Sequence, residues 1–346
     1  MRKAVRKLHL WLGLSLGLLF VLLGLTGSAL VFYTKIDGWL NPVAPVETSA
    51  APDWNRAVAT VRTAFPDKAG PWRFEVTGEA GPIPARYYDP PETAGRDFAP
   101  MMVWLSPDAA QVVRKDYWGD YAMTFLYGLH YRLLLGEMGG TILGYAGIAL
   151  FVLLVTGLWA WWPRGSWRKA LRYKAGASRS RTLRDIHKLS GLWGMVLLLM
   201  LTVTGVMLEL PDESDAVLAA TIGPVDAMPK PGSHDWQGPQ IPLTRAMATA
   251  RATLPSARIA WVEVPGVGDG AFKIRMALSG DPSDRFPHSF AWIDQYSGRV
   301  LAVTDARTAG ASTTINNWIH ALHDGSAGGL PLRLLVLIAG LVPLIL

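Results

Sequence analysis

Four long apolar runs constrain this chain more than any other feature. Leu10–Phe32, Thr141–Trp162 and Leu189–Leu210 carry almost no charge, and Leu330–Leu346 is shorter but as apolar. A helix of about 20 apolar residues spans the roughly 30 Å hydrocarbon core of a bilayer. The first run is longer than a signal-peptide core and no small-x-small cleavage site follows it, so we expect it to be retained. The sequence therefore predicts four membrane-spanning helices.

Basic residues predict the orientation of these helices. The N-terminus carries four basic residues within its first seven, and 163–185 carries eight. Short loops rich in Lys and Arg stay in the cytoplasm. We therefore expect an inner-membrane protein of bacterial type, with a cytoplasmic N-terminus and with 40–118 and 215–312 on the periplasmic side. Membrane topology accounts for most of the net charge of +6, so we expect a lipid bilayer and no nucleic acid as partner.

The absence of cysteine limits the chemistry. Iron–sulfur clusters, disulfides, thiolate metal ligands and haem attached through Cys-x-x-Cys-His are all excluded, because the chain has no cysteine. Any haem must be held by side chains such as histidine.

The chain reads as an internal duplication. His9 and His187 each precede the Gly of a Thr-Gly pair by 18 residues, and His130 and His323 each precede a Gly by 17 residues. The segments between the spans repeat as well, each with a helical stretch that ends in Pro and is followed by strand-like runs and a hairpin pattern.

The predicted fold is a membrane all-α four-helix bundle with two external α+β domains. The segments are a first span (8–34), a first external domain (40–118), an interfacial helix with the second span (120–162), a basic loop (163–185), a third span (186–210), a second external domain (215–312), and an interfacial helix with the fourth span (313–346). The repeat alignment matches Leu346 with Leu153, from which span two continues to Trp162. The fourth span is therefore either naturally short or truncated.

His9 and His187 form the first candidate site. Both lie where a span leaves the cytoplasm, and neutral imidazole is a good axial ligand for haem iron. Gly13 and Gly191 stand four residues after them on the same helix face, which leaves room for a flat macrocycle. The alternatives are histidines that merely face the interface and glycines that serve close helix packing.

Arg6 and Arg184 lie three residues before these histidines, again on the same face. Their guanidinium groups suit haem propionates. The positive-inside rule alone also explains them.

His130 and His323 form the second candidate site, on the external side. We expect a second haem b there, which gives an electron path across the bilayer. His320 is either an alternative ligand or part of an external metal–substrate site. His234 and His288 are expected to be ordinary loop or strand residues.

The chain also resembles a known family. Arg6-x-x-His9-x-x-x-Gly13, Leu25-Thr26-Gly27, Leu129-His130 with its trailing glycines, and Val155-Thr-Gly-Leu-Trp159 look like the PepSY-associated transmembrane helix proteins. The external segments look like PepSY domains. The resemblance implies a bacterial inner-membrane protein with periplasmic PepSY domains. Some members of that family act as siderophore–iron reductases and bind b-type haem.

The leading function is a haem-dependent oxidoreductase. It is expected to pass electrons from a cytoplasmic or quinol donor to a periplasmic acceptor, such as a ferric siderophore. The alternative is a non-catalytic PepSY-bearing scaffold or regulator of envelope proteins. A transporter is disfavoured, because no span is broken in its middle or carries an internal charge.

Overall fold

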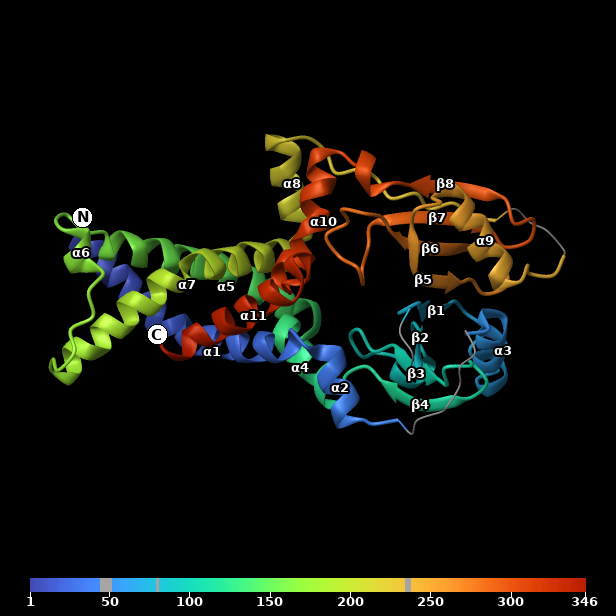
Figure 1. Cartoon of the computed structure of the whole chain (residues 1–346), viewed down its shortest axis with the longest axis horizontal. Coiled ribbons are helices and arrows are strands. Elements are labelled where there is room, and N and C mark those ends of the chain that lie inside the picture. Colours follow the sequence, from blue (N-terminus) through green and yellow to red (C-terminus); the bar gives the residue numbers. More distant parts are fainter. Residues whose placement is uncertain (44–51, 79–80, 234–237) are drawn as a thin grey trace. The chain divides into compact units, whose positions relative to one another are not determined.

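The chain folds into two compact units. The computed structural model describes residues 1–43, 52–78, 81–233 and 238–346 (Figure 1). Residues 1–33, 126–218 and 318–346 form what we call the helix unit, and residues 34–125 and 219–317 form the sheet unit. The chain passes between the two units several times, so each unit is built from both halves of the sequence.

Within the described residues, the helix unit contains four helices that are long and apolar enough to cross a membrane. They are α1 (Arg2–Leu30), α5 (Gly136–Trp161), α7 (Arg179–Glu209), and a last span, Ser326–Leu344, made of η3 (Ser326–Gly328), α11 (Gly329–Leu341) and η4 (Val342–Leu344). The prediction of four spans is confirmed. Both α1 and α7 begin before their apolar runs, which places His9 and His187 inside continuous helices.

The four helices form a closed ring of contacts. α1 contacts α5 and α11, and α7 contacts the same two helices. α1 and α7 therefore lie at opposite corners of the bundle. Glycines allow the close approaches: a Cβ on Gly147 of α5 would lie 2.6 Å from Val206 Cγ2 of α7, and Gly24 of α1 faces the backbone of Gly340. Small residues have this role in many membrane helix pairs.

Shorter helices lead the chain into and out of the bundle. They are α2 (Tyr33–Leu40), α4 (Ala122–Arg132), α6 (Trp167–Ala170), α8 (Pro211–Thr221) and α10 (Ala311–His323). Leu133, Leu134 and Gly136 all have positive φ, so the chain turns sharply between α4 and α5. This turn leaves the end of α4, with His130, against the bundle.

In the part of the chain that the structure describes, the sheet unit is built around one antiparallel sheet of eight strands in the order β4-β3-β2-β1-β5-β6-β7-β8. The strands are β1 (Trp72–Glu75), β2 (Ile83–Tyr87), β3 (Met101–Leu105), β4 (Val112–Tyr117), β5 (Arg258–Val264), β6 (Ala271–Ala277), β7 (Ser289–Asp294) and β8 (Val300–Thr304). Short 3-10 turns follow β2 and β8, namely η1 (Pro91–Thr93) and η2 (Ala306–Thr308).

The two halves of the chain meet at the centre of this sheet. β1 pairs with β5, with Phe74 opposite Val262. The expectation of two separate external domains is therefore corrected: each half supplies four neighbouring strands of a shared sheet. The physical reason is that β1 and β5 would each leave an unpaired edge in an isolated half, and their pairing removes both edges.

The two faces of the sheet differ. Two helices, α3 (Trp54–Ala64) and α9 (Leu243–Thr253), cover one face (Figure 1), and the hydrophobic core lies beneath them. Successive strand residues point to opposite faces, so Trp72 and Phe74 enter this core whereas Arg73 points away from it. We call the second face, which carries Arg73, the polar face.

Candidate functional site

The first histidine pair joins opposite corners of the bundle. His9 of α1 and His187 of α7 have ring centroids 6.1 Å apart, with an interplanar angle of 78°. α1 and α7 are not among the closely packed helix pairs of the bundle, so the two side chains approach each other from opposite corners.

Backbone carbonyls fix the tautomer of this pair. The Nδ1 atom of His9 lies 3.1 Å from the carbonyl oxygen of Leu153, and that of His187 lies 3.0 Å from the carbonyl oxygen of Leu346. A carbonyl can only accept, so each Nδ1 carries the proton and donates it. Each Nε2 is then left with its lone pair, which is the form of histidine that binds metals.

The second pair is built in the same way. His130 of α4 and His323 of α10 have ring centroids 6.1 Å apart, with an interplanar angle of 50°. Their Nδ1 atoms lie 2.9 Å from the hydroxyl oxygens of Thr26 and Thr204 respectively. Burial lowers the pKa of both histidines, which favours neutral rings.

The threonines act as acceptors. The hydroxyl of Thr26 donates to the carbonyl oxygen of Leu22 at 2.8 Å, and that of Thr204 donates to the carbonyl oxygen of Met200 at 2.7 Å. Each hydroxyl has one proton, so its oxygen accepts from the histidine Nδ1–H. Nε2 is again left with its lone pair. Within the described residues, no hydrogen bond reaches Nε2 in any of the four rings.

Three glycines make room for the rings. A Cβ on Gly27 would lie 2.8 Å from Cε1 of His130, one on Gly205 would lie 3.2 Å from Cε1 of His323, and one on Gly157 would lie 2.8 Å from Cε1 of His9. Real Cβ atoms do not approach so closely, so side chains at Gly27 and Gly157 would displace a ring. These glycines and the two threonines were not predicted as site residues, although the repeated Thr-Gly pairs marked the positions of Thr26, Gly27, Thr204 and Gly205.

The sequence of the chain matches a known protein family over nearly its whole length. A family model described as PepSY-associated TM region matches residues 6–346. The chain belongs to this family. No curated protein sequence matches it. In this PepSY-associated chain, the matched region includes all four paired histidines.

Gly13 and Gly191, four residues after His9 and His187, are less tightly packed than the three glycines beside the histidine rings. A Cβ on Gly13 would lie 3.9 Å from Leu153, and one on Gly191 would lie 3.5 Å from Leu346. These are ordinary van der Waals distances, so packing between the described parts of the protein does not require glycine at either position. The expected role of Gly13 and Gly191 beside a cofactor stays a prediction.

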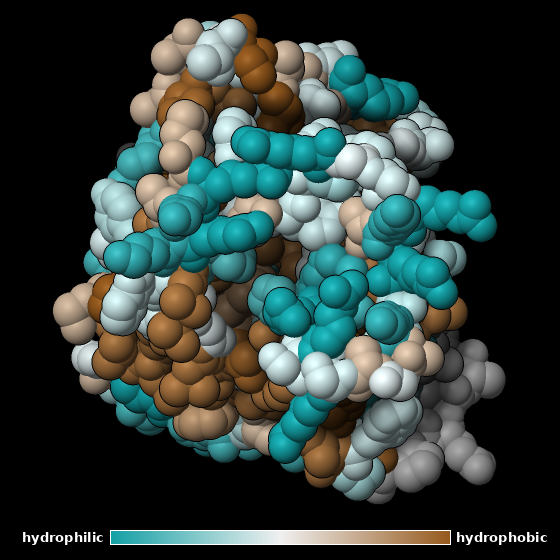
Figure 2. Space-filling model, turned by 90° about the vertical axis from the view of Figure 1, so that its left-hand side faces the viewer, coloured by the Kyte–Doolittle hydropathy of each residue, from teal (hydrophilic) through white to brown (hydrophobic). Residues whose placement is uncertain are grey.

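Arg6 and Arg184 lie together in a strongly basic pocket at the N-terminal ends of α1 and α7. The other cations that line it are Arg2, Arg164, Lys169, Arg181 and Lys188. Its one carboxylate, Asp185, is buried and pairs with Arg181 and Lys188. Figure 2 views this end of the molecule and shows hydrophilic side chains gathered over apolar ones. The two predicted arginines are therefore brought together near the first histidine pair.

The remaining histidines belong to neither pair. His320 of α10 is 41 % exposed at its side chain, with Nδ1 3.8 Å from Asp324 Oδ2. His288 interacts with Asp281, which accepts from its backbone N–H at 2.7 Å and lies 3.1 Å from its Nδ1. His234 lies outside the described residues.

The residues present fit haem b. Within the described residues, no third His, Cys, Asp or Glu joins a pair to form a metal site. A bare metal ion would need further protein ligands, whereas a porphyrin brings its own four nitrogens and needs only axial ones. Two imidazole rings that held one metal ion through bonds of about 2 Å would have ring centroids roughly 6 Å apart. Both observed separations, 6.1 Å, agree with that value.

Proposed function

We propose that this chain is a bacterial inner-membrane protein that binds two haem b groups and passes electrons across the membrane to a periplasmic acceptor, a ferric siderophore. The observation that carries the proposal is the pair of matching sites. His9 with His187, and His130 with His323, each offer two Nε2 lone pairs with the same ring separation.

The two sites lie at different depths in the bundle. His9 lies near the start of α1, and Thr26, which binds His130, lies near its end. Seventeen residues of helix correspond to about 25 Å along the axis, which is most of the thickness of a hydrocarbon core of roughly 30 Å. One redox centre cannot serve both faces at this distance, so two are required.

The orientation follows the basic residues. We place the N-terminus and the basic pocket in the cytoplasm, and the sheet unit, formed by two PepSY-like halves of a duplication, in the periplasm. The donor is then a cytoplasmic reductant or a membrane quinol.

The protein and the cofactor have different tasks. Haem b supplies reversible one-electron chemistry when bound. The four histidines would hold the iron, and their Nδ1 hydrogen bonds orient the rings and raise the basicity of Nε2. Arg6 and Arg184 are positioned to pair with propionate carboxylates.

The test is electron transfer in a closed system. The purified protein is reconstituted in liposomes that hold dithionite inside and a ferric siderophore outside. We expect haem absorption bands that change on reduction and Fe(II) outside the vesicles, trapped by a chromogenic chelator. Empty liposomes and protein with His323→Ala should release little Fe(II). A purified protein with no haem bands would contradict the proposal and favour the scaffold alternative.

A further inference from the structure

The polar face of the sheet carries a row of charged residues across its centre. Arg86 of β2 pairs in register with Arg73 of β1, which pairs with Glu263 of β5, which pairs with Lys273 of β6. In the adjacent row, Arg275 of β6 lies between Trp261 and Phe290. Four cations therefore lie on one sheet face, on the three strands β2, β1 and β6.

These four cations form no ion pair within the described residues. Glu75, on the same face, is occupied by Arg285 through two hydrogen bonds of 2.7 and 2.9 Å. Within the described residues, no carboxylate lies within ion-pair distance of Arg73, Arg86, Lys273 or Arg275. Glu263 is the single acid that pairs with them in register. Burial and the charge of Arg73 lower the pKa of Arg275 to about 10, which leaves it charged at neutral pH.

Two of these arginines have a buried donor without an acceptor. The Nε atoms of Arg86 and Arg275 are shielded from solvent, and neither has a hydrogen-bond partner in the described structure. A buried donor without a partner is destabilising, and more so when it belongs to a charged group. Both arginines are neighbours of Trp261. Arg86 Cζ lies 5.8 Å from the ring centroid of Trp261, and Arg275 pairs with Trp261 in register.

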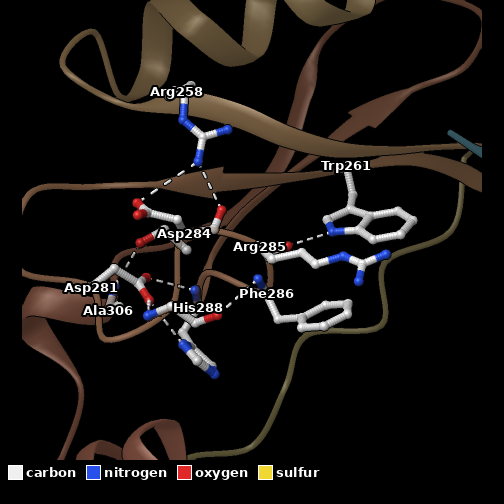
Figure 3. A network of polar contacts seen from close by, with 10 residues as sticks. Arg258, Trp261, Asp281, Asp284, Arg285, Phe286, His288 and Ala306 are labelled. Atoms are coloured by element: carbon white, nitrogen blue, oxygen red, sulfur yellow. Dashed lines mark hydrogen bonds and ion pairs between the residues drawn. The ribbon is translucent and has the colours of Figure 1, made fainter. Parts of the chain in front are cut away.

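Aromatic rings hold the cations in place. Arg73 Cζ lies 4.4 Å from the ring centroid of Trp261, and Arg275 Cζ lies 4.9 Å from that of Phe290. Trp261 also stacks on Phe286, with centroids 5.7 Å apart and an interplanar angle of 12°. Figure 3 shows the side chains of Trp261, Arg285 and Phe286 beside one another. Cation–π contacts use the faces of the guanidinium groups. They therefore leave the N–H donors at the edges of these groups without acceptors, and they do not remove the repulsion between the neighbouring cations.

We propose that the polar face binds an anionic oxygen-rich ligand whose negative oxygens accept from Arg86 and Arg275, next to Arg73 and Lys273. The chemical class is a negatively charged metal chelate with aromatic rings, such as a ferric tris-catecholate. Its oxygens match the donors, and its rings match the surrounding Trp and Phe side chains. That the ligand carries iron rests on the proposed function, whereas the anion site rests on the sheet alone.

The test uses a probe that cannot be reduced. A Ga(III) tris-catecholate has the charge and shape of the ferric complex but no accessible redox chemistry, and a Ga(III) tris-hydroxamate is a neutral control. Binding to the full-length protein in detergent is measured by calorimetry. We expect the trianion to bind, more weakly as salt screens the charges, and the neutral complex to bind at least about tenfold more weakly.

Variants locate the site. Arg86→Gln and Arg275→Gln should each weaken binding of the trianion by about tenfold or more, since each removes a charge-assisted hydrogen bond. Arg251→Gln, exposed on α9, is the matched control and should bind as the parent does. Because the cations repel one another, the melting temperature of Arg275→Gln should stay equal to that of the parent or rise.

Several results would overturn the inference. They are equal binding of the neutral and anionic complexes, unchanged binding in both arginine variants, or a lower melting temperature in both variants, which would make the cluster structural. The test is independent of haem. Binding of the gallium complex without reduction of the ferric complex would support the anion site and contradict the reductase function. Reduction of the ferric complex without binding of the gallium complex would support the reductase function and contradict the anion site.

Discussion

The Nδ1 atom of His130 donates to the hydroxyl oxygen of Thr26, 2.9 Å away on another helix. His323 and Thr204 make the same contact at the same distance. This relationship determines which ring nitrogen of each histidine is free to bind a metal. It also links each histidine directly to α1 or α7, so a change in either threonine acts on its histidine.

Replacing Thr26 with Val should change the midpoint potential of one haem and leave the fold intact. The variant keeps the shape of the side chain but removes the acceptor, so Nε2 of His130 becomes less basic and stabilises Fe(III) less. We expect the midpoint potential of one haem to rise, as measured by spectroscopic redox titration. Thr26→Ser keeps the hydroxyl and should keep the parent potential. Equal potentials in the Val and Ser variants would show that the contact does not tune the iron.

A methyl group at Gly27 should displace His130. A Cβ there would lie 2.8 Å from Cε1 of His130, and overpacking of this kind costs about 1–3 kcal/mol. We expect Gly27→Ala to lower the haem content, measured as the ratio of haem to protein. Gly17→Ala on the same helix meets nothing within 4 Å and is the matched control. Full haem content in both variants would contradict the tight packing around His130.

The orientation of the chain can be read from reporter fusions. Alkaline phosphatase is active only outside the cytoplasm. A fusion at Gly78 in the sheet unit should therefore be active, and a fusion at Gly176 between α6 and α7 should be inactive. The opposite pattern would reverse the proposed topology and the direction of electron flow.

An ion pair should make the stability of the sheet unit depend on pH. The buried Lys68 ammonium lies 2.7 Å from the carboxylate of Glu92 and lowers the pKa of Glu92. A lowered folded-state pKa gives stability that is present above the unfolded value, about 4.3, and is lost as pH falls through the folded value. Glu92→Gln should therefore melt below the parent at neutral pH and match it in strong acid. A melting difference that does not change with pH would rule out this linkage.

Local patterns predicted the helix unit well. The spans follow from hydropathy, and the pairing of His9 with His187 and of His130 with His323 follows from their matching spacing and from topology. The hydrogen bonds to Thr26 and Thr204 were not predicted, because they join helices whose relative rotation the sequence does not state.

Non-local pairing explains what the sequence analysis missed in the sheet unit. β1 and β5 pair although more than 180 residues separate Phe74 from Val262, and no local signal specifies such a partner. The polar face follows from the same cause. The alternation in Trp72-Arg73-Phe74 is visible in the sequence, but only the strand order brings Arg73 next to Arg86 and near Arg275.

Haem stoichiometry tests the central claim most directly. A pyridine haemochrome assay on purified protein should give two haem b per chain for the parent and for His320→Ala, which is outside both pairs. It should give about one per chain for His9→Ala and for His323→Ala, and the two variants should lose different low-spin signals in electron paramagnetic resonance. Unchanged haem content in both pair variants, or a parent protein without haem, would contradict the account.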